Sequence, residues 1–226
     1  MKDYLKISNE DNMELMKRFP DNYFDLAIVD PPYQIKRFSE NMESQGTLGK
    51  SIFLGKNKIQ DWDKLPTQEY FDELFRVSKN QIIWGANHFW NTANLPNCTN
   101  FIFWDKKMPF ENFSRGELAW TSFKGVSKCF EYNYYGNIEG KTQSQGRIHP
   151  TQKPVALYEW VLNKYAKEND NILDTHLGSG SIAIAVDNMN KMEKMNLTLT
   201  ACELDNDYYN STIKRINIKT NWQSLF

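Results

Sequence analysis

Cysteine and histidine are both scarce in this sequence, with three of each among 226 residues. Cys98, Cys129 and Cys202 stand far apart, which disfavours a disulfide framework and is typical of a reducing compartment. Neither residue type recurs at the spacing of metal ligands, so we expect no metal site.

Long apolar runs are absent too. No stretch approaches the ~20 apolar residues that a membrane-spanning helix needs, and the N-terminus has no charged start followed by an apolar segment. We therefore expect a soluble protein of the cytoplasm. With 226 residues and a hydrophobic fraction of 40%, the chain can form one α/β domain over residues 1–226, with little room for a second.

The chain also lacks an excess of charge, because its formal net charge is −1. A global attraction to nucleic acid is thus excluded, and any such binding must come from a local patch. Lysine and arginine outnumber acidic residues in two segments, 34–60 and 106–153. Each segment can form a nucleic-acid surface or simply be a solvated loop.

Apolar strand-like runs alternate with helical patterns from about residue 23, which predicts a largely parallel sheet covered on both faces. The connection between the strands near 101 and 117 is too short for a crossover helix, so we expect that pair to be antiparallel, at one edge of the sheet. The expected strands are 25–29, 81–84, 101–104, 117–123, 172–174 and 197–202, and the expected helices are 67–78, 154–166, 181–190 and 206–216.

The strongest local motif is Asp30-Pro31-Pro32-Tyr33, directly after the first of these strands. Two prolines fix a turn at the carboxyl edge of the sheet and remove two donors, which leaves carbonyl oxygens free to accept. The carboxylate of Asp30 and the carbonyl of Pro31 can hold the two hydrogens of an exocyclic base amine and stabilise charge that develops on it. Tyr33 can stack on an extruded base. The alternative is a tight turn without chemistry.

A second motif, Asp174 to Ser181, lies between a predicted strand and a predicted helix. Its glycines let a nucleotide approach the backbone, and the helix N-terminus offers unpaired amides. Gly178, Gly180 and Ala183 also satisfy the loose dinucleotide fingerprint, which would make the protein a dehydrogenase. Only 46 residues follow Gly180, however, too few for a complete dinucleotide domain unless the chain is permuted. Glu203, at the end of the next strand, can hold ribose hydroxyls in either case.

The third motif runs from His149 to Pro154, with the sequence His-Pro-Thr-Gln-Lys-Pro, and opens the helix expected at 154. It can be no more than the turn that leads into that helix. Its polar residues can also cap the helix and face a cofactor carboxylate, with Lys153 as the cation.

In this order, the three motifs resemble the β-group of permuted amino-methyltransferases that act on DNA, a group with adenine-N6 enzymes among small stand-alone phage and bacterial proteins. The resemblance covers nearly the whole chain. It implies a Rossmann-like α/β methyltransferase sheet of seven strands, circularly permuted and mostly parallel, with an antiparallel edge strand and helices on both faces. The strands at 172 and 197 must then pair beside the one at 25.

The resemblance implies a site-specific methyltransferase that uses S-adenosyl-L-methionine and methylates the N6 amine of an adenine flipped out of double-stranded DNA, as in restriction–modification. Glu203 would bind the cofactor's ribose hydroxyls, Thr151 and Lys153 its methionine part, and Asp11 would lie near its adenine. His176 stands where the family usually has phenylalanine. The implied catalytic residues are Asp30, Pro31, Pro32 and Tyr33. The implied cofactor-binding residues are Asp11, Asp30, Thr151, Lys153, Asp174, His176, Gly178, Ser179, Gly180, Ser181, Glu203 and Leu204.

The expected DNA surface combines the loop 34–60 with the short segment 124–148 as candidate target-recognition elements. Family members are often dimers, so a homodimer is also expected. The implied DNA-contacting residues are Lys36, Arg37, Lys124, Lys128, Lys141 and Arg147.

Several alternatives stay open. Cytosine N4 is the main one, because its amine poses the same chemical problem, although family enzymes on cytosine more often have serine where Asp30 stands. Methylation of protein glutamine would favour asparagine there. An inactive DNA-binding partner of another subunit is disfavoured by the intact motifs. We expect Trp84, Trp104 and Trp120 in the core, while Asn87 and His88 follow a strand end and can line the site.

Overall fold

The computed structural model describes residues 1–33, 64–89, 93–109, 111, 114–133, 148 and 152–222. Their strands form one eight-stranded sheet in the order β1-β8-β7-β2-β3-β5-β4-β6. The strands are β1 (Leu5–Asn9), β2 (Leu26–Val29), β3 (Gln81–Trp84), β4 (Phe101–Asp105), β5 (Gly116–Thr121), β6 (Lys128–Glu131), β7 (Asn171–Asp174) and β8 (Thr198–Glu203).

The centre of the sheet joins parts of the chain that are far apart in sequence. β2 pairs in parallel with β7, with Leu26 opposite Ile172, and with β3, with Ile28 opposite Ile82. β8 extends the sheet beyond β7. The prediction that the strands at 172 and 197 pair beside the one at 25 is therefore confirmed, and so is the mostly parallel α/β sheet.

Two details of the predicted sheet are wrong. The sheet has eight strands among the described residues, not seven, and the antiparallel strand is not at the edge. β5 does pair antiparallel with β4, as expected, but it also pairs antiparallel with β3 and so lies inside the sheet. The edge belongs to β6, which is parallel to β4 and satisfies backbone groups that β4 would otherwise expose. β6 was assigned to the loop 124–148 because four residues of alternating burial give a weak strand signal.

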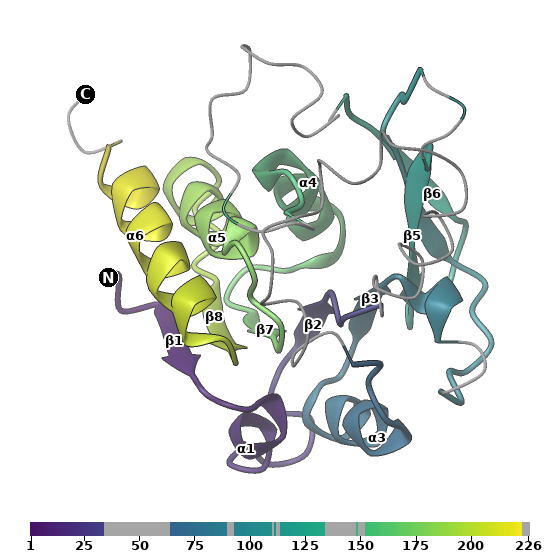
Figure 1. The fold of residues 1–226 in the computed structure, drawn as a ribbon, viewed down its shortest axis with the longest axis horizontal. Helices are drawn as coiled ribbons and strands as arrows, with labels where there is room; N and C mark the ends of the chain where they lie inside the picture. Colours follow the sequence, from purple (N-terminus) through teal and green to yellow (C-terminus); the bar gives the residue numbers. More distant parts are fainter. Residues whose placement is uncertain are drawn as a thin grey trace, which may run out of the picture.

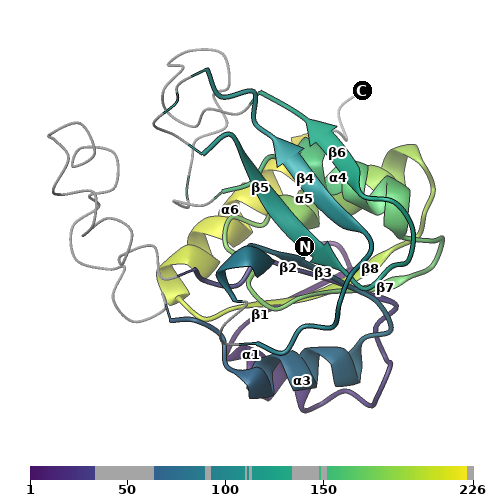
Figure 2. The same ribbon diagram turned by 90° about the vertical axis from the view of Figure 1, so that its right-hand side faces the viewer.

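Helices cover both faces (Figures 1 and 2). α4, α5 and α6 pack on one face over a core that includes Leu157, Ile182 and Ile216, and α1 and α3 pack on the other over Leu15 and Phe71. The four expected helices are confirmed, and within the described ranges no helix is long and apolar enough to cross a bilayer. The bounds are α1 (Asn12–Met16), α3 (Gln68–Val77), the 3-10 helix η2 (Ala86–His88), α4 (Val155–Tyr165), α5 (Ser181–Met192) and α6 (Asn206–Trp222).

Tryptophan fills the core where the sequence predicts it. Trp84, Trp104 and Trp120 are all buried, on β3, β4 and β5.

The strand directions decide which residues meet at one edge. The parallel strands β2, β7 and β8 end next to Asp30, at Asp174 and at Glu203, so these three carboxyl groups belong to the same edge of the sheet. β5 runs the other way, so its beginning, with Glu117, lies at that edge and its end at the opposite one. Open α/β sheets bind their ligands at the carboxyl edge of the parallel strands.

Candidate functional site

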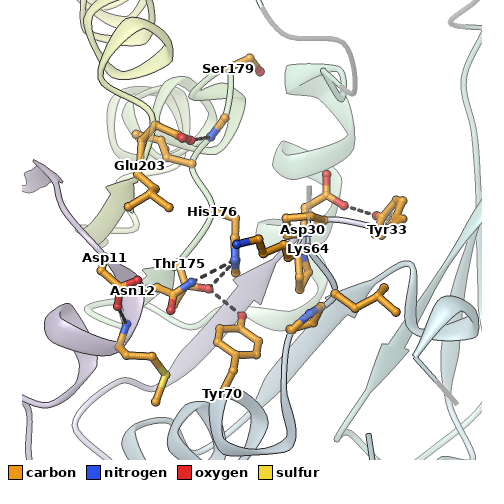
Figure 3. A pocket seen from close by; sticks show the side chains of 18 of the residues that line it. Asp11, Asn12, Asp30, Tyr33, Lys64, Tyr70, Thr175, His176, Ser179 and Glu203 are labelled. Atoms are coloured by element: carbon orange, nitrogen blue, oxygen red, sulfur yellow. Dashed lines mark hydrogen bonds between the residues drawn. The ribbon is translucent and has the colours of Figure 1, made fainter. Parts of the chain in front are cut away.

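A pocket of about 370 Å³ opens at this carboxyl edge. In Figure 3, Asp11 and Glu203 lie on one side of it and Asp30 and Tyr33 on the other. Its size is in the range of sites for small molecules and cofactors. Most of the predicted catalytic and cofactor-binding residues line it: Asp11, Asp30, Pro31, Pro32, Tyr33, Lys153, His176, Gly178, Ser179, Ser181, Glu203 and Leu204. Thr175, from the second motif, lines it too.

The Asp30 turn closes one end of the pocket. β2 is buried along its whole length, so its exit is fixed and Asp30 follows it directly. The Tyr33 hydroxyl donates a hydrogen bond to Oδ1 of Asp30. The Tyr33 ring stacks on His88 with 4.9 Å between ring centroids, so His88 lies beside the site as expected, in contact with Tyr33.

Lys153 lies between two carboxylates. Its ammonium group forms an ion pair with Oδ2 of Asp30 and lies 3.1 Å from Oε2 of Glu117. The sequence predicts Lys153 as a partner for the methionine part of the cofactor, whereas the structure directs it to the residue predicted to be catalytic. Glu117 was not predicted as a site residue, because the sequence shows only an acidic residue at the start of a strand.

Burial and pairing shift the pKa values of these three groups. Burial raises the pKa of Asp30, and the nearby charge of Lys153 only partly offsets this effect. Burial acts to lower the pKa of Lys153, but the charges of Asp30 and Glu117 outweigh it and the pKa is raised. For Glu117 burial acts to raise the pKa, while Lys153 and Lys106 outweigh burial and hold the pKa at about 2. Lys153 and Glu117 are therefore both charged at neutral pH.

The loop that contains Asp174 and Gly178 forms the wall opposite the Asp30 turn. The backbone N–H of Gly178 donates to Oε2 of Glu203 over 2.8 Å, and Ser181 Oγ donates to the carbonyl of Lys153 over 2.7 Å. The Asp174 carboxylate is buried behind the loop and accepts from the His176 N–H, and burial raises its pKa to about 8. Asp174 thus orders the loop without lining the pocket.

Gly180 does not line the pocket. A Cβ there would lie 2.6 Å from Thr212 Cγ2 and 2.9 Å from Ile216 Cδ1, and its φ is +71°. The structure therefore explains this glycine by the close packing of α6, and the prediction that it contacts the cofactor is not supported.

His176 belongs to a chain of polar side chains at the floor of the pocket (Figure 3). Its Nδ1 lies 2.9 Å from Thr175 Oγ1, which lies 2.7 Å from the Tyr70 hydroxyl, and its Nε2 lies 3.1 Å from Asn12 Nδ2. Burial lowers the pKa of His176 to about 4, so the imidazole is neutral at pH 7.

Asp11 lines the pocket and also caps α1. Its carboxylate accepts from the N–H groups of Met13 and Glu14, which satisfies two donors of the first turn. The carboxylate is therefore held at a fixed place in the pocket wall.

Several lining residues were missed by the sequence reasoning. Tyr70 reads as a core residue of an amphipathic helix, and it is indeed buried, but its hydroxyl reaches Thr175. The others gave no motif signal: Glu10, Asn12, Met13, Lys64, Leu65, Pro66, Thr67, Gln152, Tyr158 and Leu177.

The predicted DNA contacts are not brought together. Lys124 and Lys128 follow the end of β5 and begin β6, so they lie at the edge of the sheet opposite Asp30. The topology therefore argues against their contacting DNA beside the pocket, because an interior antiparallel strand carries its C-terminal end away from it. The remaining predicted contacts and one cofactor contact lie outside the described residues: Lys36, Arg37, Lys141, Arg147 and Thr151.

The arrangement suits a substrate with hydrogen-bond donors. A buried carboxylate with a raised pKa lies at one end of the pocket, and a second carboxylate, Glu203, lies at the other. Such groups accept hydrogen bonds from amines and hydroxyls. Among the described residues, histidine, cysteine and acidic side chains form no group of three that could hold a metal ion.

The comparisons with known proteins agree with this chemistry. The model of the N6_N4_Mtase family, described as DNA methylase, matches residues 24–214. The type II methyltransferase M2.LlaDCHI of Lactococcus lactis subsp. cremoris is 22% identical over 247 residues, which cover 92% of this chain and 87% of the relative. The type II methyltransferase M2.MboI of Moraxella bovis is 25% identical over 213 residues, which cover 76% of this chain and 75% of the relative.

Solved structures share the fold. The M1.HpyAVI–SAM complex has a TM-score of 0.53 at 16% identity and covers 94% of this chain and 99% of its own. A DNA modification methylase of Thermus thermophilus complexed with S-adenosyl-L-methionine has a TM-score of 0.55 at 16% identity, with 96% and 94% covered. The cytosine-N4-specific PvuII DNA methyltransferase has a TM-score of 0.53 at 13% identity, with 96% and 93% covered.

Proposed function

The chain belongs to the DNA methylase family, and we propose that it is a site-specific DNA methyltransferase that modifies the N6 amine of adenine, with S-adenosyl-L-methionine as methyl donor. The observation that carries the proposal is the buried carboxylate of Asp30, at the end of a cofactor-sized pocket and directly after β2. We take residues 1–226 as a single methyltransferase domain, acting in the cytoplasm where bacterial and phage DNA lies.

The choice of base rests on Asp30. The fold itself is shared with a cytosine-N4-specific enzyme, so it does not decide between the two amines. Family enzymes on cytosine more often have serine at this position, and an aspartate therefore favours adenine. Cytosine N4 is the second candidate, since the same site could hold its amine.

The pocket fits S-adenosyl-L-methionine. Glu203 offers a carboxylate at the pocket wall for ribose hydroxyls, and its own position is fixed by the N–H groups of Gly178 and Asp205. Asp11, Asn12 and His176 provide polar atoms where the adenine of the cofactor would lie. When bound, the cofactor supplies an electrophilic methyl group on its sulfonium.

The chain's own residues prepare the amine of the target base. Oxygens of Asp30 and Pro31 would accept the two amine hydrogens, favour a pyramidal nitrogen and stabilise positive charge that develops on it. The Asp30 carboxylate, whose pKa burial raises, can then take up the proton that the methylated amine releases. Tyr33 would stack on the flipped base, opposite the ring face that meets His88.

Target recognition is assigned to residues 34–60 and to parts of 124–148, of which only Lys128–Glu131 form a described strand. These segments are short, so we also propose that two copies of the chain act together on DNA. Sedimentation of the protein with and without a DNA duplex measures this. A single chain per duplex would contradict it.

The proposed function is tested by expressing the protein in cells that lack adenine methylation and sequencing their DNA for modified bases. We expect N6-methyladenine within one short motif, and none with Asp30→Ala as the matched control. N4-methylcytosine would keep the mechanism but contradict the assigned base. No modified base, although the purified protein binds S-adenosyl-L-methionine, would contradict the proposed substrate.

A further inference from the structure

Glu117 connects the predicted catalytic turn to two lysines. It is the second residue of β5, and the reversed direction of that strand brings it to the same edge as Asp30. Its Oε2 lies 3.1 Å from the Lys153 ammonium and its Oε1 lies 2.5 Å from the Lys106 ammonium. Lys153 is thus held from one side by Asp30 and from the other by Glu117.

The burial of these groups makes the arrangement specific. The Lys153 side chain is 2% exposed, against 14% for Asp30 and 25% for Glu117. A buried ammonium group is costly unless charged partners surround it, so Lys153 stays where both carboxylates can reach it. The Trp84 ring, with its centroid 5.5 Å from the ammonium, completes the enclosure.

Charge gives Glu117 a function beyond holding Lys153. The amine of the target base gains positive charge as the methyl group arrives, so the site must be negative there. Asp30 and Lys153 alone would sum to zero. The charge of Glu117 makes the group of three net negative while Lys153 continues to orient Asp30.

We propose that Glu117 is a positioning residue for methyl transfer, which holds the Lys153 ammonium against Asp30 and offsets its charge so that Asp30 can accept the target amine. This inference rests on the proposed function, because it assigns Asp30 to the amine.

The pH dependence follows from the charges around Glu117. The negative charge of Glu117 raises the pKa of both Asp30 and Lys153. Without it both pKa values fall, so the acid and the basic limb of the rate profile both move to lower pH. The titratable and charged groups that interact with Glu117 are Asp30 and Tyr33 after β2, His88 on η2, Lys106 after β4, and Lys153 and Tyr158 at α4.

The first experiment compares Glu117→Gln with Glu168→Gln, which removes the same charge from an exposed residue between α4 and β7. We expect Glu117→Gln to lower kcat roughly tenfold or more, with both pH limbs shifted to lower pH and the Kd for S-adenosyl-L-methionine changed less than about twofold. Glu117→Asp keeps the charge and should restore the pH limbs. Unchanged kcat and limbs in Glu117→Gln would overturn the proposal.

A double-mutant cycle with Lys153→Met tests whether Glu117 acts through Lys153. If it does, Glu117→Gln combined with Lys153→Met is no slower than Lys153→Met alone. If the two losses simply multiply, the two residues act independently and the proposal is wrong.

A measurement without turnover separates this inference from the proposed function. In the free protein, carboxyl carbon NMR should give Glu117 a pKa near its value of about 2, and Lys153→Met should raise that pKa. No rise would overturn the proposal, even in an active enzyme. If the rise is seen but the parent protein methylates no DNA, the proposed function has failed while the Glu117–Lys153 contact stands.

Discussion

The ring of Tyr33 packs directly on the α-carbon of Gly85, the residue that follows β3. A Cβ at Gly85 would lie 2.1 Å from Cε1 and 2.4 Å from Cζ of that ring. The φ of Gly85 is +69°, in the left-handed region that side chains disfavour. The exit of β3 is therefore shaped to receive the tyrosine of the neighbouring Asp30 turn.

Gly85→Ala should displace Tyr33 and lower kcat for methyl transfer roughly tenfold or more, because the ring cannot keep its place under the base. The left-handed backbone alone should lower the free energy of unfolding by about 1–2 kcal/mol. Activity assays and thermal unfolding measure the two effects.

Gly125 provides the matched control for this variant. Its φ of +128° also disfavours a side chain, but nothing lies within 4 Å of a Cβ there. Gly125→Ala should therefore lose stability and keep activity. Equal losses of kcat in both variants would show that the contact with Tyr33 does not matter.

His176→Phe should flatten the acid dependence of stability. The folded-state pKa of about 4 lies below the ordinary 6.5, so the stability that neutral His176 provides is present above pH 6.5 and is lost as the pH falls toward 4. Phenylalanine keeps a ring next to Tyr70 but does not titrate.

Urea unfolding of parent and variant at several values between pH 7.5 and pH 4 measures this effect as the difference between two curves. Asp174, whose pKa is raised to about 8, titrates in both proteins and cancels in that difference. Parallel curves would show that His176 is protonated as easily in the folded protein as in the unfolded chain.

The sequence predicts what depends on neighbouring residues. The Asp30 turn, the Gly178 loop and Glu203 are local motifs at strand ends, and the parallel sheet brings all three to one pocket. The direction of β5 is not local, because it depends on pairing with both β3 and β4. That direction decides that Glu117 joins the site.

Two further differences have the same origin. The spacing of Gly180 matches a nucleotide-binding loop, yet the residue it must avoid is Thr212, on a helix that comes after the next strand in the chain. Lys153 has the right chemistry for a cofactor carboxylate, but the partner it finds is Asp30, 123 residues away in sequence. Sequence motifs identify the chemical groups, whereas long-range packing selects their partners.

Glu203→Ala should weaken binding of S-adenosyl-L-methionine roughly tenfold or more, because it removes the proposed acceptor for ribose hydroxyls and frees the Gly178 N–H. Isothermal titration calorimetry measures the Kd. Glu193→Ala, at an exposed position after α5, is the control and should bind the cofactor normally. An unchanged Kd in Glu203→Ala would remove Glu203 from its proposed role.

Asp30→Ala should reduce methyl transfer by roughly a hundredfold or more while it leaves cofactor binding nearly intact, because the acceptor of the target amine is lost. Since the pKa of Asp30 is raised, the acid limb of the parent's kcat profile should lie above the ordinary carboxyl value of 3.8. Single-turnover assays with labelled cofactor measure both. Retained turnover would contradict the assignment of Asp30.

Arg115→Ala should weaken DNA binding, because the connection between β4 and β5 stands at the same edge as the pocket and Arg115 is exposed on it. If its guanidinium contacts one phosphate, the slope of log Kd against log salt should fall by about 0.9. Fluorescence anisotropy with a duplex at several salt concentrations measures both quantities.

Lys124→Ala removes the same charge at the opposite edge of the sheet and provides the comparison. We expect the affinity and the salt slope of this variant to stay close to those of the parent. The reverse result, a reduced slope for Lys124→Ala and none for Arg115→Ala, would mean that DNA approaches from the β5–β6 connection. The flipped base would then have to reach Asp30 across the length of the sheet, which the strand directions make difficult.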